Sequence, residues 1–348
     1  MLNKLTRKEN LTADEAAHLM EKMMRNEYSP VMAGALLTAL RIKGETVDEI
    51  TAFARVMHTF CHRVNFPTKE PLLDTCGTGG DGVGTYNIST TVALIAASAG
   101  IRVAKHGNRA ASSKSGSADV LEALGFSLSL PAEKLVECLL KTGFCFLFAR
   151  EHHQAMLAIA PVRKDLGIRT VFNLLGPLTN PAGATHQVVG LFSPDHLETV
   201  AHVLERLGTR RALVVHGDGT DEFTVTGPSR YIEVRDGRIT AKILYPEECD
   251  LTRARHESLL GGDAAENAGI IRDVLTPRKV KKDPKRDMAL LNAGAALYVA
   301  GHSPSIKEGV NAARNLIEKG KALQKLEEIK AFTIQASLSR GEEGVRKP

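Results

Sequence analysis

The sequence lacks the features of membrane and secreted proteins. No apolar run approaches the roughly 20 residues that a membrane helix needs, and the longest candidate, residues 92–101, is interrupted by Ser98 and Gly100. The first residues, MLNK, lack the apolar segment of a signal peptide. The five cysteines are an odd number, and none forms a C-x-x-C pair for zinc or redox chemistry. We therefore expect reduced cysteines, no membrane partner and a cytoplasmic protein.

Charge and composition also narrow the class of protein. The net charge of +5 is small for 348 residues. The one dense basic run, RKVKKDPKR at residues 278–286, has no aromatic residue on which a base could stack. We interpret it as a solvated loop and expect no nucleic-acid partner. With 43% hydrophobic and 24% charged residues, the chain is typical of a globular protein with one large domain, or one large and one small.

The first 65 residues are predicted to be helical. Two capping boxes, Thr12 with Glu15 and Thr46 with Glu49, predict helix starts, because threonine caps the third helical N–H and glutamate bonds back to the cap. Between them, residues 29–30 (SP) predict a capped start with proline at the first helical position, and Gly44 predicts an end. Three such short helices cannot bury their apolar faces alone. We expect them to pack on the rest of the chain and to self-associate.

After a linker at residues 67–71 the pattern changes to alternating strands and helices. Strands are predicted at residues 72–76, 100–104, 186–192 and 211–216, and helices at residues 90–99, 118–124 and 193–207. Such alternation is typical of an α/β domain with a largely parallel sheet and ligands at the carboxyl ends of its strands.

A glycine loop, GTGGDGVG at residues 77–84, joins the first predicted strand to its helix. Five glycines allow many backbone N–H groups to approach an anion, which indicates a phosphate site. The loop also contains the dinucleotide pattern G-x-G-x-x-G, which requires an acidic residue about 20 positions later to hold ribose hydroxyls. Lys105 and His106 stand there instead. Cations at that point suit phosphate groups and argue against a dinucleotide site. A glycine turn without a ligand is also disfavoured, because so many glycines cost folding entropy without a packing benefit.

Two further segments are candidates for phosphate binding. The first, NIST at residues 87–90, places hydroxyls at a helix start, where simple N-capping is an equal explanation. The second, KHGNRAASSKSGS at residues 105–117, contains three cations and four serines between a strand and a helix. Its position beside the glycine loop favours a site for pyrophosphate and a 5-phosphate over a solvated loop.

Carboxylates and arginines complete the candidates. Asp221 and Glu222 follow the strand at residues 211–216. Adjacent carboxylates often form a surface turn, but beside a polyphosphate they suit Mg²⁺, which prefers one or two carboxylates with substrate oxygens and water. Asp218 could also contribute.

Arg163 and Arg169 precede an apolar helix. They either form salt bridges at the surface or are available to bind a planar carboxylate.

With these residues in place, the sequence resembles the anthranilate phosphoribosyltransferases of tryptophan biosynthesis over essentially its whole length. The motifs are GTGGDG (77–82), KHGNR (105–109), SGSAD (115–119) and RTVFNLLGPLTNP (169–181). The resemblance implies the fold of class II nucleoside phosphorylases, with a small all-α domain hinged to a large α/β domain. The expected bounds are residues 1–66, joined by a segment near residues 165–185, and residues 71–345. A homodimer through the helical domain is also implied.

The resemblance also implies the site residues. Phosphoribosyl pyrophosphate (PRPP) would bind Gly77, Gly80, Asp81, Thr85, Asn87, Ile88, Ser89, Thr90, Lys105, His106, Gly107, Asn108, Arg109, Ala110, Ala111, Ser112, Ser113 and Ser117. Anthranilate would bind near Gly77, His106, Asn108, His153 and Arg163. Two Mg²⁺ ions are expected, one through Ser89 and one through Asp221 with Glu222. Lys105, Arg163, Asp221 and Glu222 would be catalytic. The segment FAREHH at residues 148–153 departs from the proline-containing form of many members, so the role of His153 stays open.

The implied reaction joins the amine of anthranilate to the ribose carbon of PRPP and expels pyrophosphate. An aromatic amine is unprotonated at neutral pH, so the need is to stabilise the departing pyrophosphate rather than to supply a strong base. We expect inversion at the ribose carbon and no covalent intermediate. Two alternatives are a pyrimidine nucleoside phosphorylase and a nucleic-acid-binding relative. Members of the second class lack an intact glycine loop and acidic pair, both present here.

Overall fold

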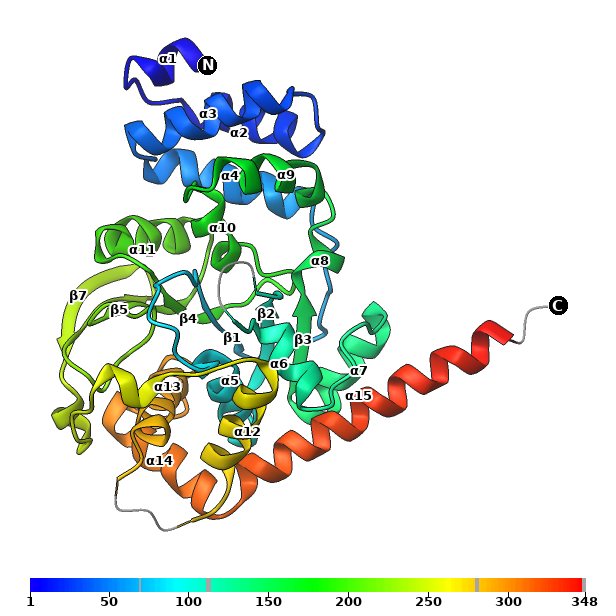
Figure 1. Ribbon diagram of the computed structural model, residues 1–348, viewed down its shortest axis with the longest axis vertical. Helices are drawn as coiled ribbons and strands as arrows, with labels where there is room; N and C mark the ends of the chain where they lie inside the picture. Colours follow the sequence, from blue (N-terminus) through cyan, green and yellow to red (C-terminus); the bar gives the residue numbers. More distant parts are fainter. Residues whose placement is uncertain (69, 111–113, 279–281, 346–348) are drawn as a thin grey trace.

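The computed structural model describes residues 1–68, 70–110, 114–278 and 282–345, with side chains described up to residue 338. It consists of a small helical part beside a larger α/β part (Figure 1). The helical part begins with four helices rather than the three expected, because a short additional helix precedes the first capping box. These helices are α1 (Leu2–Thr6), α2 (Ala13–Met24), α3 (Pro30–Lys43) and α4 (Val47–Thr59).

The predicted helix starts in this region are confirmed. Thr12 and Thr46 each accept a hydrogen bond from the third helical N–H, and Glu15 and Glu49 complete the two capping boxes. Ser29 caps α3 ahead of Pro30, and Gly44 ends that helix with φ 85°. Local hydrogen bonds set these boundaries.

A seven-stranded sheet forms the centre of the larger part, in the order β3-β2-β1-β4-β5-β6-β7. The first five strands in this order are parallel, as expected, whereas β6 pairs antiparallel with β5 and with β7 at one edge. Three strands, β3, β6 and β7, were not predicted. The strands are β1 (Leu72–Gly77), β2 (Arg102–Gly107), β3 (Phe144–Phe148), β4 (His186–Gly190), β5 (Arg211–Gly217), β6 (Ser229–Arg235) and β7 (Arg238–Leu244).

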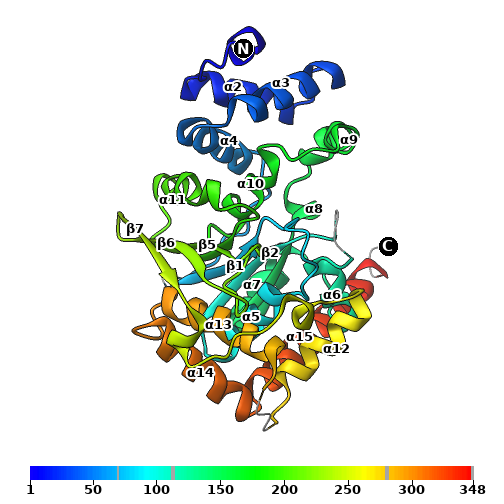
Figure 2. The ribbon, with the colours of Figure 1, turned by 60° about the vertical axis from the view of Figure 1, so that its left-hand side comes forward.

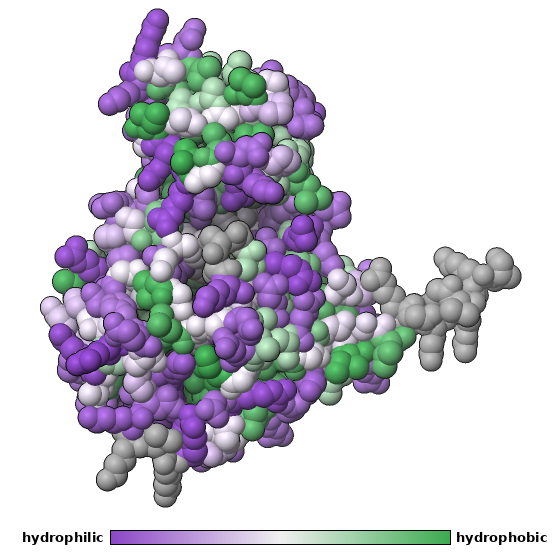
Figure 3. All heavy atoms as spheres, viewed as in Figure 1, coloured by the Kyte–Doolittle hydropathy of each residue, from purple (hydrophilic) through white to green (hydrophobic). Residues whose placement is uncertain are grey.

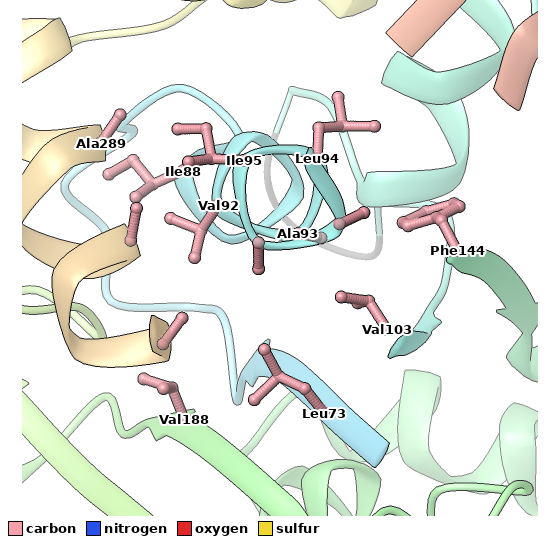
Figure 4. Close-up of a cluster of buried hydrophobic side chains, with 14 of the residues drawn as sticks. Leu73, Ile88, Val92, Ala93, Leu94, Ile95, Val103, Phe144, Val188 and Ala289 are labelled. Atoms are coloured by element: carbon pink, nitrogen blue, oxygen red, sulfur yellow. The ribbon is translucent and has the colours of Figure 1, made fainter. Parts of the chain in front are cut away.

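Helices cover both faces of the sheet, and Figure 4 shows part of the larger core around α5. Alternate strand residues face the two layers: Val188 lies in the core with α5, and Val189 lies in the core shared with the helical part. The remaining helices are α5 (Ile88–Ser98), α6 (Ser117–Ala123), α7 (Ala132–Thr142), α8 (Ala149–His152), α9 (Met156–Leu166), α10 (Phe172–Leu178), η1 (Pro194–His196), α11 (Leu197–Arg206), η2 (Pro246–Cys249), η3 (His256–Leu259), α12 (Ala264–Leu275), α13 (Pro284–Val299), α14 (Ile306–Glu318) and α15 (Lys321–Val345).

Two helices from the middle of the chain connect the helical part to the sheet. α9 packs against α2 and α3, and α10 packs against α4 (Figure 2). α10 lies within the segment near residues 165–185 that was expected to join the helical domain, and α9 ends at the start of that segment. Their buried side chains belong to the same core as the amino-terminal helices and one face of the sheet. The exact domain bounds stay a prediction.

The interpretation of the basic run as a fully solvated loop is wrong for Arg286. This residue is 8% exposed and lies on α13. Its guanidinium donates to the carbonyls of Thr276 at 2.6 Å and Arg278 at 2.9 Å, so it ties α13 to the end of α12. Residues 279–281 lie outside the described residues.

Within the part of the chain that the structure describes, no helix combines the length and apolar character needed to cross a membrane.

Candidate active site

The glycine loop connects β1 to α5, as predicted. Gly79, Gly80, Gly82 and Gly84 all have positive φ angles between 63° and 81°. Side chains rarely adopt this conformation, so glycine is required here. The loop folds back on itself through Asp81, whose carboxylate accepts a hydrogen bond from the Val83 N–H at 3.1 Å. The result is a turn whose backbone N–H groups lie near the start of α5, where the helix dipole also favours an anion.

The start of α5 is not capped by Asn87, contrary to the simple capping interpretation. Asn87 occupies the cap position without a side-chain cap bond. Its amide instead donates to the Ser115 carbonyl at 3.1 Å and accepts from Asn267 at 2.9 Å. The side chain of Asn87 therefore joins the start of α5 to the loop at residues 105–117 and to α12. The Thr90 hydroxyl is buried and has no hydrogen-bond partner among the residues that the structure describes.

Lys105 lies beneath this helix start rather than at the surface. It is 2% exposed, and its ammonium donates to the Thr75 carbonyl at 2.5 Å and to the Ser89 hydroxyl at 3.2 Å. Burial lowers its pKa, and the charge of Asp74 opposes that effect. The structure thus places Lys105 directly behind Ser89.

The loop after β2 is held closed by Asp119, from the motif SGSAD. Its carboxylate accepts hydrogen bonds from the backbone N–H groups of Ala110 and Gly116, both at 2.9 Å. Arg109 pairs with Asp119 and more closely with Glu122. The Ser117 hydroxyl donates to the Asn108 carbonyl at 3.2 Å. Ala111, Ser112 and Ser113, expected to bind PRPP, lie outside the described residues.

The acidic pair, Asp221 and Glu222, comes directly against the glycine loop. Asp221 accepts a hydrogen bond from the Gly79 N–H at 2.7 Å, and its own N–H donates to Asp81 at 3.4 Å. Burial, together with the charge of Asp81, raises the pKa of Asp221 to about 7. Burial and then the charge of Asp221 raise the pKa of Glu222 well above its ordinary value. Tertiary structure therefore gathers three carboxylates at one point beside the candidate phosphate site.

This donor set fits Mg²⁺. Carboxylates that repel one another beside a phosphate loop are stabilised by a divalent cation, and Mg²⁺ accepts a few protein oxygens with substrate and water oxygens for the rest. Among residues 1–68, 70–110, 114–278 and 282–345, no group of three or more His, Cys, Asp or Glu side chains is arranged to hold a metal alone. Substrate oxygens would have to complete the coordination.

Two neutral histidines form a second area of the site. The rings of His106 and His153 have centroids 5.1 Å apart. His106 contacts the Gly176 carbonyl and His153 the Thr179 carbonyl, at 3.2 and 3.0 Å. Burial lowers the pKa of both rings, that of His153 to about 4. Nε2 of His106 is buried and, within the described part of the chain, has no hydrogen-bond partner.

Arg163 stands on α9, in the helical part. Its guanidinium lies 5.3 Å from the Phe172 ring centroid, and burial lowers its pKa. Within the described residues it forms no ion pair. The surface salt-bridge interpretation is therefore wrong for Arg163, which keeps its planar donor set available.

Sequence reasoning left two contacts unassigned. The Arg169 guanidinium donates to the Gly80 carbonyl, which ties the α9–α10 connection to the glycine loop. Asp218 does not join the acidic pair: its carboxylate accepts from the Thr226 hydroxyl at 2.8 Å and contacts His256 at 3.2 Å. The motif at residues 169–181 includes Arg169 and so marked it as a candidate, but no local pattern predicts that it contacts Gly80.

Comparisons with known proteins agree with this arrangement. The helical bundle domain of a glycosyl transferase family matches residues 1–61, and the α/β domain of that family matches residues 69–323. The chain is 52% identical over 327 residues to the anthranilate phosphoribosyltransferase of Rubrobacter xylanophilus, covering 94% of each chain. The chain belongs to the anthranilate phosphoribosyltransferase family.

Solved structures from the anthranilate phosphoribosyltransferase family share the fold. The crystal structure of the Thermus thermophilus enzyme has a TM-score of 0.89 and 50% identity, and the match covers 95% of this chain and 98% of that one. The Saccharomyces cerevisiae enzyme in complex with PRPP and Mg has a TM-score of 0.88 and 25% identity, covering 96% and 98%. The expected fold, a small helical domain beside a larger α/β domain, is confirmed.

Proposed function

We propose that this chain transfers the phosphoribosyl group of PRPP to the amine of anthranilate, the reaction for which its family is named. The products are N-(5-phosphoribosyl)anthranilate and pyrophosphate, and the reaction belongs to tryptophan biosynthesis. The observation that carries the choice of acceptor is Arg163, a partly buried guanidinium without an ion-pair partner among the described residues. A planar carboxylate suits its fork of donors.

In the proposed complex, the anthranilate ring lies between Arg163 and the two histidines. His106 and His153 are neutral at physiological pH because burial lowers their pKa values, so they can line an uncharged aromatic amine without repelling it. Nε2 of His106 is buried with no partner in the described ranges of the chain, so it offers a hydrogen bond to a ligand. Gly77 and Asn108 lie at the ends of β1 and β2, on the phosphate side.

PRPP is held by the glycine loop, the start of α5 and the loop after β2. Its phosphates accept hydrogen bonds from backbone N–H groups of these segments, as helix starts and glycine turns allow. Ser89 and Thr90 lie in the first turn of α5, and we expect their hydroxyls to contribute to the same site. Lys105, buried behind Ser89, contributes its charge through that hydroxyl rather than by surface contact.

Asp221, Glu222 and Ser89 would hold Mg²⁺, in our proposal as two ions. Bound Mg²⁺ supplies positive charge to the pyrophosphate oxygens as negative charge develops on them. The protein orients PRPP and anthranilate so that the amine faces the ribose carbon opposite the leaving group. The amine loses its proton after the bond forms, so no strong base is required. Direct displacement of this kind inverts the ribose carbon.

The helical domain is the proposed dimer surface, and α9 and α10 connect it to the sheet as the hinge segment. α3 exposes Val31 at 84%, Ile42 at 70% and Met32 at 40%, and Figure 3 shows hydrophobic side chains over the amino-terminal helices. Unpartnered apolar side chains gathered on one helix favour an interface.

All five cysteines are free and buried, which favours the cytoplasmic location that we propose.

One assay tests the reaction. Anthranilate fluorescence should fall when the protein is mixed with PRPP and Mg²⁺, and the fall should require both. Release of pyrophosphate in equal amount would confirm the stoichiometry. Phosphorolysis of thymidine or uridine without loss of anthranilate fluorescence would instead identify a pyrimidine nucleoside phosphorylase.

A further inference from the structure

The acidic pair lies across the carboxyl ends of three neighbouring parallel strands. β1, β4 and β5 each end in a glycine, namely Gly77, Gly190 and Gly217. The first two are direct partners in the sheet register. None of the three has a positive φ angle. Their backbone conformation therefore does not require glycine, and another reason is needed for a glycine at the end of each of these three strands.

The reason is the space occupied by the acidic pair. A Cβ atom at position 190 would overlap the backbone carbonyl of Asp221, and one at position 77 would overlap the Asp221 carboxylate. A Cβ atom at position 217 would overlap the Glu222 carbonyl oxygen. At positions 190 and 217 the obstacle is backbone, which cannot rotate away as a side chain can. Glycine at these strand ends allows the acidic pair to lie directly on the sheet.

Asn292 holds the same segment from the other side. It is 1% exposed, on α13. Its amide oxygen accepts from the Phe223 N–H at 2.9 Å, and its amide nitrogen donates to the Phe223 carbonyl at 2.7 Å. Phe223 is fully buried and follows Glu222 directly. Asn292 thus satisfies both backbone polar groups of the residue next to the acidic pair, and leaving them unpaired would be costly.

We propose that Asn292 and Gly190 are positioning residues that fix the acidic pair and thereby set the Mg²⁺ requirement of the reaction. The proposal rests on the metal-ligand role proposed above for Asp221 and Glu222. Asn292 fixes the chain immediately after the pair, and Gly190 fixes how closely it approaches the sheet. Because metal affinity depends on ligand geometry, a small shift of this segment weakens Mg²⁺ binding without removing a ligand.

Two variants act on the segment from opposite sides. Asn292→Leu keeps the size of the side chain but removes both hydrogen bonds to Phe223, and Gly190→Ala pushes against Asp221. In each, the Mg²⁺ concentration that gives half the maximal rate should rise about tenfold or more, and the Kd for Mg²⁺ in a direct calorimetric titration should rise by the same factor. The KM for anthranilate should change less than about twofold, and excess Mg²⁺ should restore much of kcat.

Matched controls separate positioning from stability. Arg286→Met also removes buried hydrogen bonds from α13 to backbone carbonyls, but those carbonyls belong to the α12–α13 connection. Gly269→Ala adds a Cβ where nothing lies within 4 Å. Both controls should keep the wild-type Mg²⁺ dependence, even where Arg286→Met lowers Tm. If Asn292→Leu does not fold, Asn292→Ala tests the same point, since it also removes both hydrogen bonds to Phe223 without adding charge or an extra apolar group.

A third variant distinguishes failure of this proposal from failure of the proposed function. Asp221→Asn with Glu222→Gln should lose the Mg²⁺ response most strongly. If that double variant responds to Mg²⁺ as wild type does, the metal-ligand role itself is wrong. If it is impaired while folded Asn292 and Gly190 variants keep the wild-type Mg²⁺ dependence, the positioning roles are overturned and the ligand roles stand. An equal shift in Arg286→Met would show a general structural effect and would also overturn them.

Discussion

The Arg169 guanidinium lies over the Phe192 ring, 4.1 Å from its centroid, and also donates to the Gly80 carbonyl. Arg169 belongs to the connection between α9 and α10, whereas Phe192 follows β4 and Gly80 lies in the glycine loop. One side chain therefore joins the proposed hinge segment to both the phosphate loop and the sheet edge. Charge and ring stacking act together in such a contact.

Removing this contact should loosen the glycine loop. We expect Arg169→Ala to raise the KM for PRPP about three- to tenfold, which corresponds to one net hydrogen bond of about 1 kcal/mol. Steady-state kinetics with each substrate varied separately measure the change. Phe192→Leu should reproduce part of the effect, and the double variant should show less than the sum. An unchanged KM for PRPP would mean that Arg169 does not support the loop.

Arg163→Ala should mainly impair the use of anthranilate. The lost bidentate contact to the carboxylate should raise the KM for anthranilate by about one to two orders of magnitude, with much less effect on PRPP. Arg163→Lys is the matched control, because it keeps the charge but not the planar fork, and it should recover only part of the loss. Equal rises for both substrates would show that Arg163 supports the domain arrangement instead.

The double change Asp221→Asn and Glu222→Gln should separate folding from turnover. Two repelling carboxylates are removed without loss of shape, so Tm without Mg²⁺ should stay the same or rise. The affinity for PRPP, itself an anion, should be retained. We expect kcat to fall by at least about two orders of magnitude, because charge on the leaving group is no longer stabilised. Calorimetry measures Tm, ligand titration measures the affinity for PRPP, and steady-state kinetics measure kcat. An unchanged kcat would mean that Asp221 and Glu222 form only a surface turn.

Acid should destabilise the protein partly through His186. Burial, together with the charges of Arg211 and Arg210, lowers the pKa of His186 to about 4, and the charge of Asp236 opposes them. In the unfolded chain the ring titrates near 6.5. As the pH falls from about 6.5 to about 4, the unfolded state binds a proton that the folded state does not, so the free energy of unfolding decreases.

The variant His186→Gln tests whether protonation of this ring lowers the free energy of unfolding in acid. It should remove up to about 3 kcal/mol of the acid sensitivity, which urea unfolding between pH 7.5 and pH 4 would measure. The exposed His302 provides a control, and His302→Gln should follow the wild-type curve. A His186→Gln curve that runs parallel to wild type over the whole range would assign the acid sensitivity to other groups.

The proposed dimer surface can be tested by charge. Val31→Glu with Ile42→Glu should give monomers in sedimentation velocity experiments, because two carboxylates would be buried at the interface. Ile243→Glu on β7 is the control, since Ile243 is also exposed, at 53%, but lies far from α3 in the fold. A double variant that stays dimeric would place the interface elsewhere.

Sequence alone determined the features that depend on neighbouring residues. The caps at Thr12, Ser29 and Thr46 could be predicted, because each cap bond spans three residues. The glycine loop could also be recognised from its composition. Strands β1, β2, β4 and β5 could also be predicted from local sequence, because a short apolar run between turn residues indicates a buried strand.

Tertiary structure alone decided what those pieces do together. Asp221 meets Gly79 across 142 residues, and Asn292 meets Phe223 across 69; no local pattern encodes either pairing. The burial of Lys105 and Arg286 also depends on distant elements that remove water from a charged side chain. The strand-end glycines could be seen in the sequence, but only the position of the acidic pair above them explains why a Cβ is excluded. Contacts of this kind come from chain topology, because packing rather than sequence spacing determines which atoms share a volume.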